Sequence, residues 1–170
     1  MILYIVRHAI AEQRNNNSSE EEDSQRPLTD AGRKKMRQIA RGLKELGAKI
    51  DLILTSPYLR AADTARTLRK KLDLEKDKLV MMDNLSPVGD PDRLMKEINE
   101  KYGTAENIAL VGHEPGLSRL ISVLISGDPT IPITLKKGGV CQLSVEKLEY
   151  GRCATLEWLL APAQLTRIGK

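Results

Sequence analysis

Four short apolar runs, each followed by an amphipathic helical pattern, constrain the fold of this chain more than any other feature of its sequence. The runs are residues 2–6, 50–55, 79–82 and 107–111. The first run is continuous and rich in β-branched residues, which is typical of a strand buried on both faces. Strands that alternate with helices predict a largely parallel sheet with helices on both of its sides.

The helical patterns carry their own start and stop signals. Thr29 and Asp30 offer capping chemistry for the first helix, and Gly47 fits its end. Ser56 is a good N-cap for the second helix, and Pro57 is a favoured first helical residue. We expect helices at residues 30–46, 57–72, 91–102 and 117–125.

The last third of the chain changes character. Residues 140–145 and 154–159 flank a turn near Tyr150 and Gly151, which predicts an antiparallel hairpin. We therefore expect an α/β fold, a three-layer α/β/α sandwich with a mostly parallel central sheet whose edge strands come from the C-terminal hairpin. The 170 residues suit one compact domain, and the chain has no internal repeat or linker. Residues 1–170 are expected to form a single domain.

One segment lacks any structural period. Residues 12–26 read EQRNNNSSEEEDSQR and are almost purely polar, so we expect a mobile surface loop. Its acidic residues suit a mobile lid or a surface that steers a partner. A solvated spacer explains the same sequence equally well.

The composition disfavours some classes of function. The chain has no Phe, one Trp and four Tyr, so it offers few aromatic faces on which bases could stack. The net charge of +4 by itself allows nucleic acid or acidic partners. The basic residues between Arg33 and Lys49 fit solvated helix faces, with a docking surface for an acidic or phosphorylated partner as the alternative. We expect no nucleic-acid partner.

The N-terminal apolar run is too short for the hydrophobic core of a signal peptide or for a membrane span, because Arg7 interrupts it. The expected location is the cytoplasm, with no membrane partner. Cys141 and Cys153 have no zinc-binding spacing, and a reducing compartment leaves them as small buried thiols. They would not face each other in a simple hairpin, which makes a disulfide the weaker alternative.

Rare and charged side chains follow three of the predicted strands directly. The chain has only two histidines, and each comes immediately after a strand, His8 behind the first and His113 behind the fourth. Arg7 precedes His8, and the second strand is followed by Ser56 and, one turn later, Arg60. In open α/β sheets, ligands bind beyond the carboxyl ends of the strands. The sequence therefore predicts a site in which these residues meet.

Such a set suits phosphoryl transfer, in which catalysis consists mainly of holding a phosphoryl group and neutralising its charge. Arg7 and Arg60 supply bidentate donors for phosphate oxygens. The helix N-termini behind Ser56 and His113 add free N–H groups. One histidine can be the nucleophile and the other a cationic donor, since imidazole titrates near neutral pH.

Taken singly, each of these residues has a structural explanation. A histidine at a strand end is often only hydrogen-bonded, Arg60 fits a solvated helix arginine, and Ser56 fits a helix cap. Only their joint placement favours a site. A metal site is not predicted, because the two histidines have no ligand spacing and nearby arginines repel a cation. The glycine-rich loops that bind nucleotides are absent from the sequence.

Three motifs together resemble the histidine phosphatase superfamily, whose members include phosphoglycerate mutases. They are RH at residues 7–8 after the first strand, SPYLRAADTA at 56–65 and VGHEP at 111–115. The short length, RPLT at 26–29 and LSPVGD at 85–90 make the chain most similar to the small bacterial phosphohistidine phosphatases of the SixA type. The resemblance covers nearly the whole chain.

The resemblance implies a phosphoglycerate mutase-like fold and a two-step reaction. His8 would be transiently phosphorylated, while Arg7, Arg60 and His113 form the phosphate pocket. It implies no metal and no organic cofactor. The implied partner is a phosphorylated protein, with a histidine-containing phosphotransfer domain as one candidate. Arg26 is a further candidate, because its position just before the first predicted helix would bring it over the pocket. A solvated loop arginine explains this residue equally well.

One departure from the family pattern bears on the substrate. Many members that cleave phosphate esters carry an acid shortly before the glycine that corresponds to Gly89, and it protonates the departing alkoxide. Here the matching position holds Leu85. The N–P bond of phosphohistidine is labile and its imidazole leaves more easily, so the missing acid favours phosphohistidine.

Candidate substitutes for the missing acid are Asp83, Asp90 and Glu114. With one of them as the acid, the first alternative function is a phosphatase or mutase that acts on a small phosphate ester. The second is a non-catalytic module that captures phosphorylated proteins.

Overall fold

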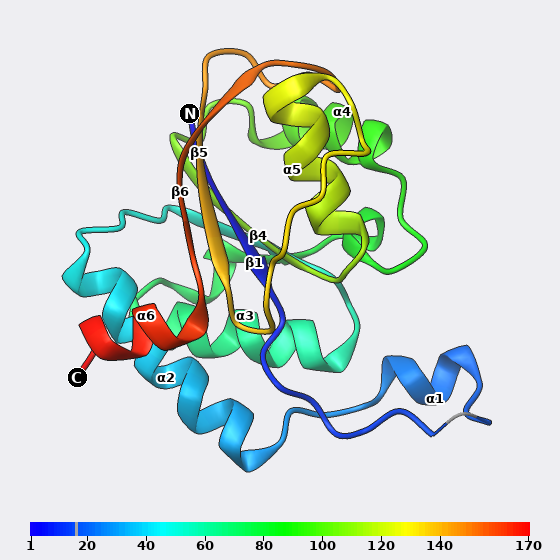
Figure 1. Ribbon diagram of the computed structural model, residues 1–170, viewed down its shortest axis with the longest axis vertical. Helices are drawn as coiled ribbons and strands as arrows, with labels where there is room; N and C mark the ends of the chain where they lie inside the picture. The colour runs from blue at the N-terminus through cyan, green and yellow to red at the C-terminus, as the bar shows by residue number, and fades with distance from the viewer. Residues whose placement is uncertain (16) are drawn as a thin grey trace.

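The computed structural model describes residues 1–15 and 17–170. They form a six-stranded sheet with the order β3-β2-β4-β1-β5-β6, shown in Figure 1. Strands β1 to β4 are parallel, and β5 and β6 continue the sheet as an antiparallel hairpin. The strands are β1 (Ile2–Arg7), β2 (Leu52–Thr55), β3 (Leu79–Met81), β4 (Asn107–Gly112), β5 (Val140–Val145) and β6 (Ala154–Leu160). The predicted fold class is confirmed, but the C-terminal hairpin supplies only one edge strand, β6, because β3 forms the other edge and β5 is interior.

Helices cover both faces of the sheet, as Figure 1 shows. Helices α2 and α3 lie on one face with α6 against α2, whereas α4 and α5 lie on the other. The α-helices are α1 (Glu20–Ser24), α2 (Asp30–Glu45), α3 (Leu59–Lys71), α4 (Pro91–Tyr102), α5 (Gly116–Ser126) and α6 (Pro162–Ile168). Two single 3-10 turns, η1 (Lys76–Lys78) and η2 (Asp83–Leu85), flank β3.

Strand β1 contributes to the core on both sides of the sheet. Leu3 and Ile5 are fully buried in the cluster under α4 and α5, whereas Tyr4 and Val6 belong to the cluster under α2 and α3. Side chains of a strand alternate between its two faces, so a strand buried on both sides must be apolar throughout. This requirement explains the continuous apolar run at the N-terminus.

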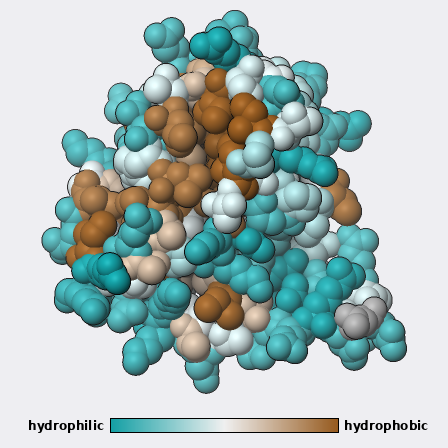
Figure 2. All heavy atoms as spheres, viewed as in Figure 1, coloured by the Kyte–Doolittle hydropathy of each residue, from teal (hydrophilic) through white to brown (hydrophobic). Residues whose placement is uncertain are grey.

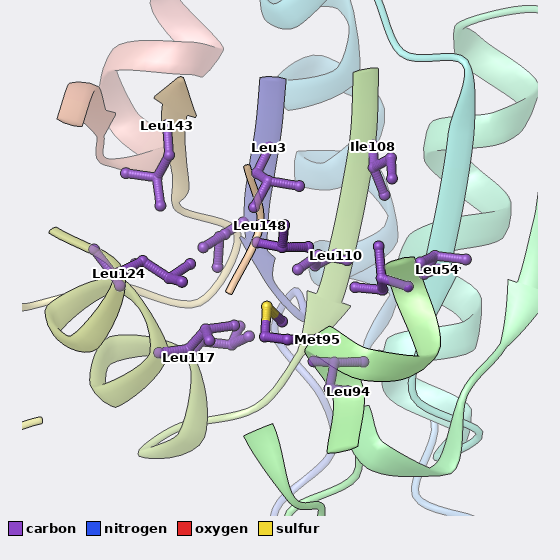
Figure 3. Close-up of a cluster of buried hydrophobic side chains, with 14 of the residues drawn as sticks. Leu3, Leu54, Leu94, Met95, Ile108, Leu110, Leu117, Leu124, Leu143 and Leu148 are labelled. Atoms are coloured by element: carbon purple, nitrogen blue, oxygen red, sulfur yellow. The ribbon is translucent and has the colours of Figure 1, made fainter. Parts of the chain in front are cut away.

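The larger cluster is drawn in Figure 3, where Leu110 of β4, Met95 of α4 and Leu117 of α5 point toward one another between the sheet and the two helices. The other cluster is built on the apolar stripe of α2. That helix also approaches α6 so closely that a Cβ at Gly42 would lie 2.1 Å from the carbonyl oxygen of Leu165. Glycine at this position therefore sets the contact between the two helices.

The expectation for residues 12–26 was wrong in part, because this segment contains helix α1. Ser19 and Glu22 form a capping box, in which the Ser19 hydroxyl accepts from the Glu22 N–H and the Glu22 carboxylate accepts from the Ser19 N–H. The single buried residue of α1 is Asp23. A helix of five residues that buries one charged side chain has no apolar stripe, and so it leaves no periodic signal.

Two other helix expectations need correction. Helix α3 begins at Leu59, not at Pro57, and its N-cap is Tyr58. The Ser56 hydroxyl accepts from the Tyr58 N–H at 3.2 Å and thereby forms a turn ahead of the helix. Helix α6 was not predicted, although Pro162 at its first position was a readable start signal.

The cysteines do not face each other, because Cys141 pairs across the hairpin with Leu159 and the strand β6 begins only after Cys153. Cys141 is buried, and both residues are free thiols in the described part of the chain. Among the described residues, no helix has both the length and the apolar character that a membrane crossing requires.

The face of the molecule in Figure 2 is uneven in character. Hydrophilic residues cover the region of α1, whereas apolar residues gather over α5. Helix α1 thus lies on a polar part of the surface, beyond the carboxyl end of β1 (Figure 1).

Candidate active site

The strand order brings the two histidines together. Strands β1 and β4 are neighbours with Arg7 opposite Gly112, and their following helices lie on opposite faces of the sheet. This is the topological switch point at which open α/β sheets bind ligands. His8 follows β1 and His113 follows β4, and their ring centroids are 5.1 Å apart. Both side chains are buried, with 6 % and 4 % of their surface exposed.

The surroundings of His8 fix its tautomer. Its Nδ1 lies 2.7 Å from the carbonyl oxygen of Ala9. A carbonyl oxygen can only accept, so Nδ1 carries the proton and Nε2 of the neutral ring keeps a lone pair. Burial is the main cause that lowers the pKa of His8 to about 4. The hydrogen bond to the Ala9 carbonyl opposes this shift, and the charges of Arg60 and Arg7 lower the pKa by smaller amounts. The ring is therefore neutral near pH 7.

His113 contacts two residues that follow strand β2. Its Nε2 lies 2.9 Å from the Ser56 hydroxyl, and its ring packs edge-on against Tyr58 at 5.3 Å between centroids. Burial, followed by the neighbouring His8 and three arginines, lowers the pKa of His113 to about 2. The expectation of a cationic histidine is therefore wrong for the pocket as described. Positive charge comes from arginine side chains instead.

Three arginines surround the histidines in the same manner, each anchored by one terminal nitrogen on a backbone carbonyl. Arg7 Nη1 donates to the carbonyl oxygen of Leu135 at 2.9 Å. Arg26 Nη1 donates to that of Glu12 at 2.7 Å, and Arg60 Nη1 donates to that of Asp23 at 2.7 Å. The Nε atoms of all three arginines, together with His113 Nδ1, are buried and find no hydrogen-bond partner among residues 1–15 and 17–170. Buried donors without acceptors are rare and costly. Such donors suit an anion.

The loop before β5 completes the anchor of Arg7. Gly138 has a φ of 80°, in the left-handed region, and its N–H donates to the carbonyl oxygens of Arg7 and His8. This turn places the Leu135 carbonyl against Arg7. Glycine is favoured at such a backbone conformation, and a Cβ at Gly138 would in addition approach Ile39 to 2.8 Å.

Asp23 is a residue of this site that our sequence interpretation missed. Its carboxylate lies 3.0 Å from Nη2 of Arg60 and 2.9 Å from Nη2 of Arg26, and only 8 % of its side chain is exposed. The structure thus also places Arg26 at the pocket, with 18 % of its side chain exposed, so a solvated loop arginine is the wrong description. The capping pair Ser19 and Glu22 was not used in our sequence interpretation, and no sequence pattern showed what the buried carboxylate of Asp23 contacts.

The candidate proton donors lie in different surroundings. Asp90 caps α4 by accepting from the N–H groups of Asp92 and Arg93, and Asp83 is exposed at the start of η2. Glu114 accepts from the Ser118 hydroxyl at 2.5 Å with Oε2, while its Oε1 is buried with no partner within the described ranges. Of the three, only Glu114 retains a buried oxygen that is not already bound.

Leu85, at the position where ester-cleaving relatives of the superfamily were expected to carry an acid, is apolar and 4 % exposed. It lines a small cavity of about 40 Å³ beside His113, with Leu94, Leu117 and Leu120. This wall of the pocket offers no proton. Within the part of the chain that the structure describes, no cluster of three or more His, Cys, Asp or Glu side chains could hold a metal ion.

Comparison with known families agrees with this geometry. The sequence profile described as histidine phosphatase superfamily (branch 1) matches residues 3–86, which include Arg7, His8, Ser56 and Arg60. The chain belongs to the histidine phosphatase superfamily. Membership supports a phosphatase.

Relatives within the superfamily span most of the chain. The phosphohistidine phosphatase SixA of Escherichia coli is 27 % identical over 167 residues, which cover 97 % of this chain and 96 % of SixA. An uncharacterized protein of Picosynechococcus is 34 % identical over 145 residues, 84 % of each chain.

Solved structures show the same likeness. The structure of the protein histidine phosphatase SixA complexed with tungstate superposes with a TM-score of 0.82 at 25 % identity and covers 97 % of this chain and 99 % of SixA. A phosphoserine phosphatase of Entamoeba histolytica in complex with 3-phosphoglyceric acid shares the fold, with a TM-score of 0.69 at 15 % identity over 96 % of this chain and 98 % of its own.

Proposed function

We propose that this histidine phosphatase hydrolyses phosphohistidine on a protein, through a phosphorylated intermediate on His8. The observation that carries the proposal is the state of the pocket. A neutral imidazole keeps a lone pair on Nε2, and four buried N–H donors around it are without acceptors in the described part of the chain. A nucleophile surrounded by unbound donors is what phosphoryl transfer requires.

In the first step, Nε2 of His8 attacks the phosphorus atom of the substrate. A P–N bond to His8 forms while the P–N bond to the substrate imidazole breaks, and the electron pair leaves with that imidazole, which takes a proton from solvent. The Nδ1–H of His8 continues to donate to the Ala9 carbonyl oxygen, which keeps the ring oriented during the attack. Arg7, Arg60 and Arg26 stabilise the charge on the phosphoryl oxygens through their Nε edges.

His113 completes the pocket as a neutral hydrogen-bond donor. The Ser56 hydroxyl donates to His113 Nε2, and the proton on Nδ1 then points its dipole at a phosphoryl oxygen. In the second step, water attacks the phosphorus atom of phosphorylated His8. The P–N bond breaks, the electron pair returns to Nε2 and phosphate leaves. All charge stabilisation comes from side chains, so we propose a reaction that is independent of metal.

The pocket wall supports one substrate class over the other. An alkoxide leaving group needs a proton from an acid of the enzyme, whereas a leaving imidazole can take its proton from solvent. Leu85, which lines a cavity together with His113, supplies no proton. We therefore favour a phosphoramidate, and a protein with an accessible phosphohistidine, such as a histidine-containing phosphotransfer domain, is the partner we propose. Such a partner places the reaction in cytoplasmic signalling.

Glu114 supports a second candidate function. Its buried Oε1 has no hydrogen-bond partner in the described ranges, and it follows His113 directly. Its carboxyl group is the candidate acid for an ester substrate. Glu114→Gln separates the two functions, because it lowers turnover of an ester and leaves phosphohistidine turnover unchanged.

The main test uses a protein phosphorylated on histidine and, in parallel, p-nitrophenyl phosphate. Loss of the N–P resonance is followed by phosphorus NMR at neutral pH, since acid assays would cleave the bond themselves. We expect faster turnover of phosphohistidine and an acid-labile radiolabel on the wild-type enzyme that is absent from His8→Ala. Retained turnover by His8→Ala would exclude the proposed nucleophile. A phosphoprotein that binds without turnover or label would indicate a capture module.

A further inference from the structure

The carboxylate of Asp23 has a function that the reaction above does not describe. We propose that Asp23 is a positioning residue, which holds Arg60 and Arg26 so that their Nε edges face the phosphoryl group. The inference rests on the proposed function for its substrate, but it concerns the arginines and can be tested by anion binding alone. Helix α1 thereby becomes part of the active site.

The contacts of Arg60 show which edge of the guanidinium is held. Nη1 donates to the backbone oxygen of Asp23 at 2.7 Å, and Nη2 donates to its Oδ2 at 3.0 Å. One residue thus binds both terminal nitrogens, while Nε is buried without a partner in the described part of the chain. The guanidinium is a planar fork, so fixing its end also fixes the direction of Nε–H and the adjacent Nη2 hydrogen. Two oxygens of one phosphoryl group can bind along that edge.

Asp23 also keeps two like charges together. Arg26 and Arg60 lie close enough that Arg26 lowers the pKa of Arg60, although burial is the larger cause. The carboxylate of Asp23 forms an ion pair with Arg26 through Oδ1 at 2.9 Å, without hydrogen-bond geometry, and accepts a hydrogen bond from Arg60 through Oδ2 at 3.0 Å. Without an anion between them, the two guanidinium groups would repel each other and turn toward other acceptors. The pair would then have to be ordered again when substrate binds.

The location of Asp23 argues against a purely structural role for this residue. Ala11 and Leu28, which flank the segment with helix α1, belong to the hydrophobic cluster under α2 and α3. Neither hydrophobic cluster has a member among the described residues between these two positions. Burial of a carboxylate costs free energy, and only pairing with the arginines offsets that cost here. The side chain therefore stabilises the pocket more than the core.

A second contact connects α1 with the site. The Tyr58 hydroxyl donates to Glu20 Oε1 at 2.8 Å. The Tyr58 ring in turn packs against His113, and the Arg60 guanidinium lies 5.0 Å from its centroid. Helix α1 thus approaches the pocket at two points. Asp23 contacts the two arginines, whereas Glu20 accepts from the hydroxyl of Tyr58, whose ring packs against His113.

The test compares Asp23→Asn with Glu21→Gln, which removes the same charge from the same helix at an exposed position. The probe is inorganic phosphate, with its Kd measured by NMR shifts of the two histidine rings, and kcat and KM are measured beside it. We expect Asp23→Asn to raise the Kd and to lower kcat/KM by at least about tenfold, the size of one charge-assisted hydrogen bond. Glu21→Gln is expected to leave both within about twofold.

A double-mutant cycle with Arg60→Lys identifies the path of the effect. If Asp23 acts through Arg60, Asp23→Asn has little further effect on the phosphate Kd in the Arg60→Lys background. Unchanged or tighter phosphate binding by Asp23→Asn would overturn the inference, as would full additivity with Arg60→Lys. The proposed function fails by a different result, retained turnover by His8→Ala, so the two failures can be told apart.

Discussion

The hydrophobic interior and the carboxyl edge of the sheet follow opposite rules, although the same strands build both. In the interior, Leu3, Ile5 and Leu110 are fully buried in close-packed clusters. At the edge, where β1 ends at Arg7 and His113 follows β4, buried polar atoms of these two residues have no partner in the described ranges. The interior stabilises the fold by removing apolar surface from water. The edge costs stability and keeps binding capacity available for an anion.

The contrast indicates that different residues determine the stability of the fold and the activity of the site. Substitutions in the interior should change the free energy of unfolding and leave the chemistry intact, whereas substitutions at the edge should do the reverse. Four predictions test this separation, from the largest expected effect to the smallest.

The largest effect concerns the proposed nucleophile. His8→Asn keeps a side-chain N–H for the Ala9 carbonyl but removes the lone pair that, in the proposed reaction, attacks phosphorus. We expect turnover to fall at least about 10⁴-fold, while the free energy of unfolding at pH 7 changes by less than about 1 kcal/mol. Steady-state kinetics and urea unfolding measure the two quantities. A large loss of both would show that the edge also supports the fold.

Leu110→Ala should give the opposite pattern. Leu110 is fully buried on β4, under helices α4 and α5 (Figure 3). We expect the free energy of unfolding to fall by about 3–5 kcal/mol, because a cavity remains where the side chain was removed. The KM of the folded fraction should stay within about twofold of wild type. A raised KM at unchanged folded population would contradict the separation.

Acid should destabilise the edge before it affects the interior. Burial lowers the pKa of His8 to about 4, below the 6.5 of an unfolded histidine, so the unfolded chain binds more protons between these values. The stability contributed by neutral His8 is complete above pH 6.5 and is lost as the pH falls toward 4. Between pH 7 and pH 5, the wild type should lose about 2 kcal/mol more than His8→Asn. Equal losses in urea unfolding would refute the burial argument.

The smallest effects compare two helix caps. Thr29 caps α2 by accepting from the Gly32 N–H at 2.9 Å, and Glu22 belongs to the capping box of α1. Thr29→Ala should lower global stability by about 1 kcal/mol, because α2 packs on the core. Glu22→Ala should lower it by less than about 0.5 kcal/mol, since α1 can open while the core stays folded. Hydrogen exchange of the α1 amides should report this local opening.

The same contrast explains what could be predicted from the sequence. Helix α2 was readable because Met36, Ile39 and Leu43 repeat with helical spacing and face the core. Helix α1 was not, because its one buried side chain is a carboxylate that pairs with an arginine 37 residues away. Periodicity reports burial of apolar surface, and it carries no information on ion pairs between distant segments.

The site was predictable to a similar degree. The positions of His8, His113, Arg7 and Arg60 after predicted strands indicated that they meet, since carboxyl ends of parallel strands share an edge. The charge state of His113 was not predictable, because it depends on burial and on the number of arginines nearby. The anchors of Arg7 and Arg60 on Leu135 and Asp23 also depend on loops whose paths no motif recorded.

The position of β1 has a consequence for synthesis on the ribosome. This strand is synthesised before its partners β4 and β5, in which Asn107 and Ser144 pair with Ile2. At about 5–20 residues per second, the growing chain carries an unpaired apolar strand for at least about 5 s before β4 emerges. Pairings of such long range slow folding, and exposed strands invite aggregation. The central strand of the enzyme is thus the part of the nascent chain with the greatest need of protection by a chaperone.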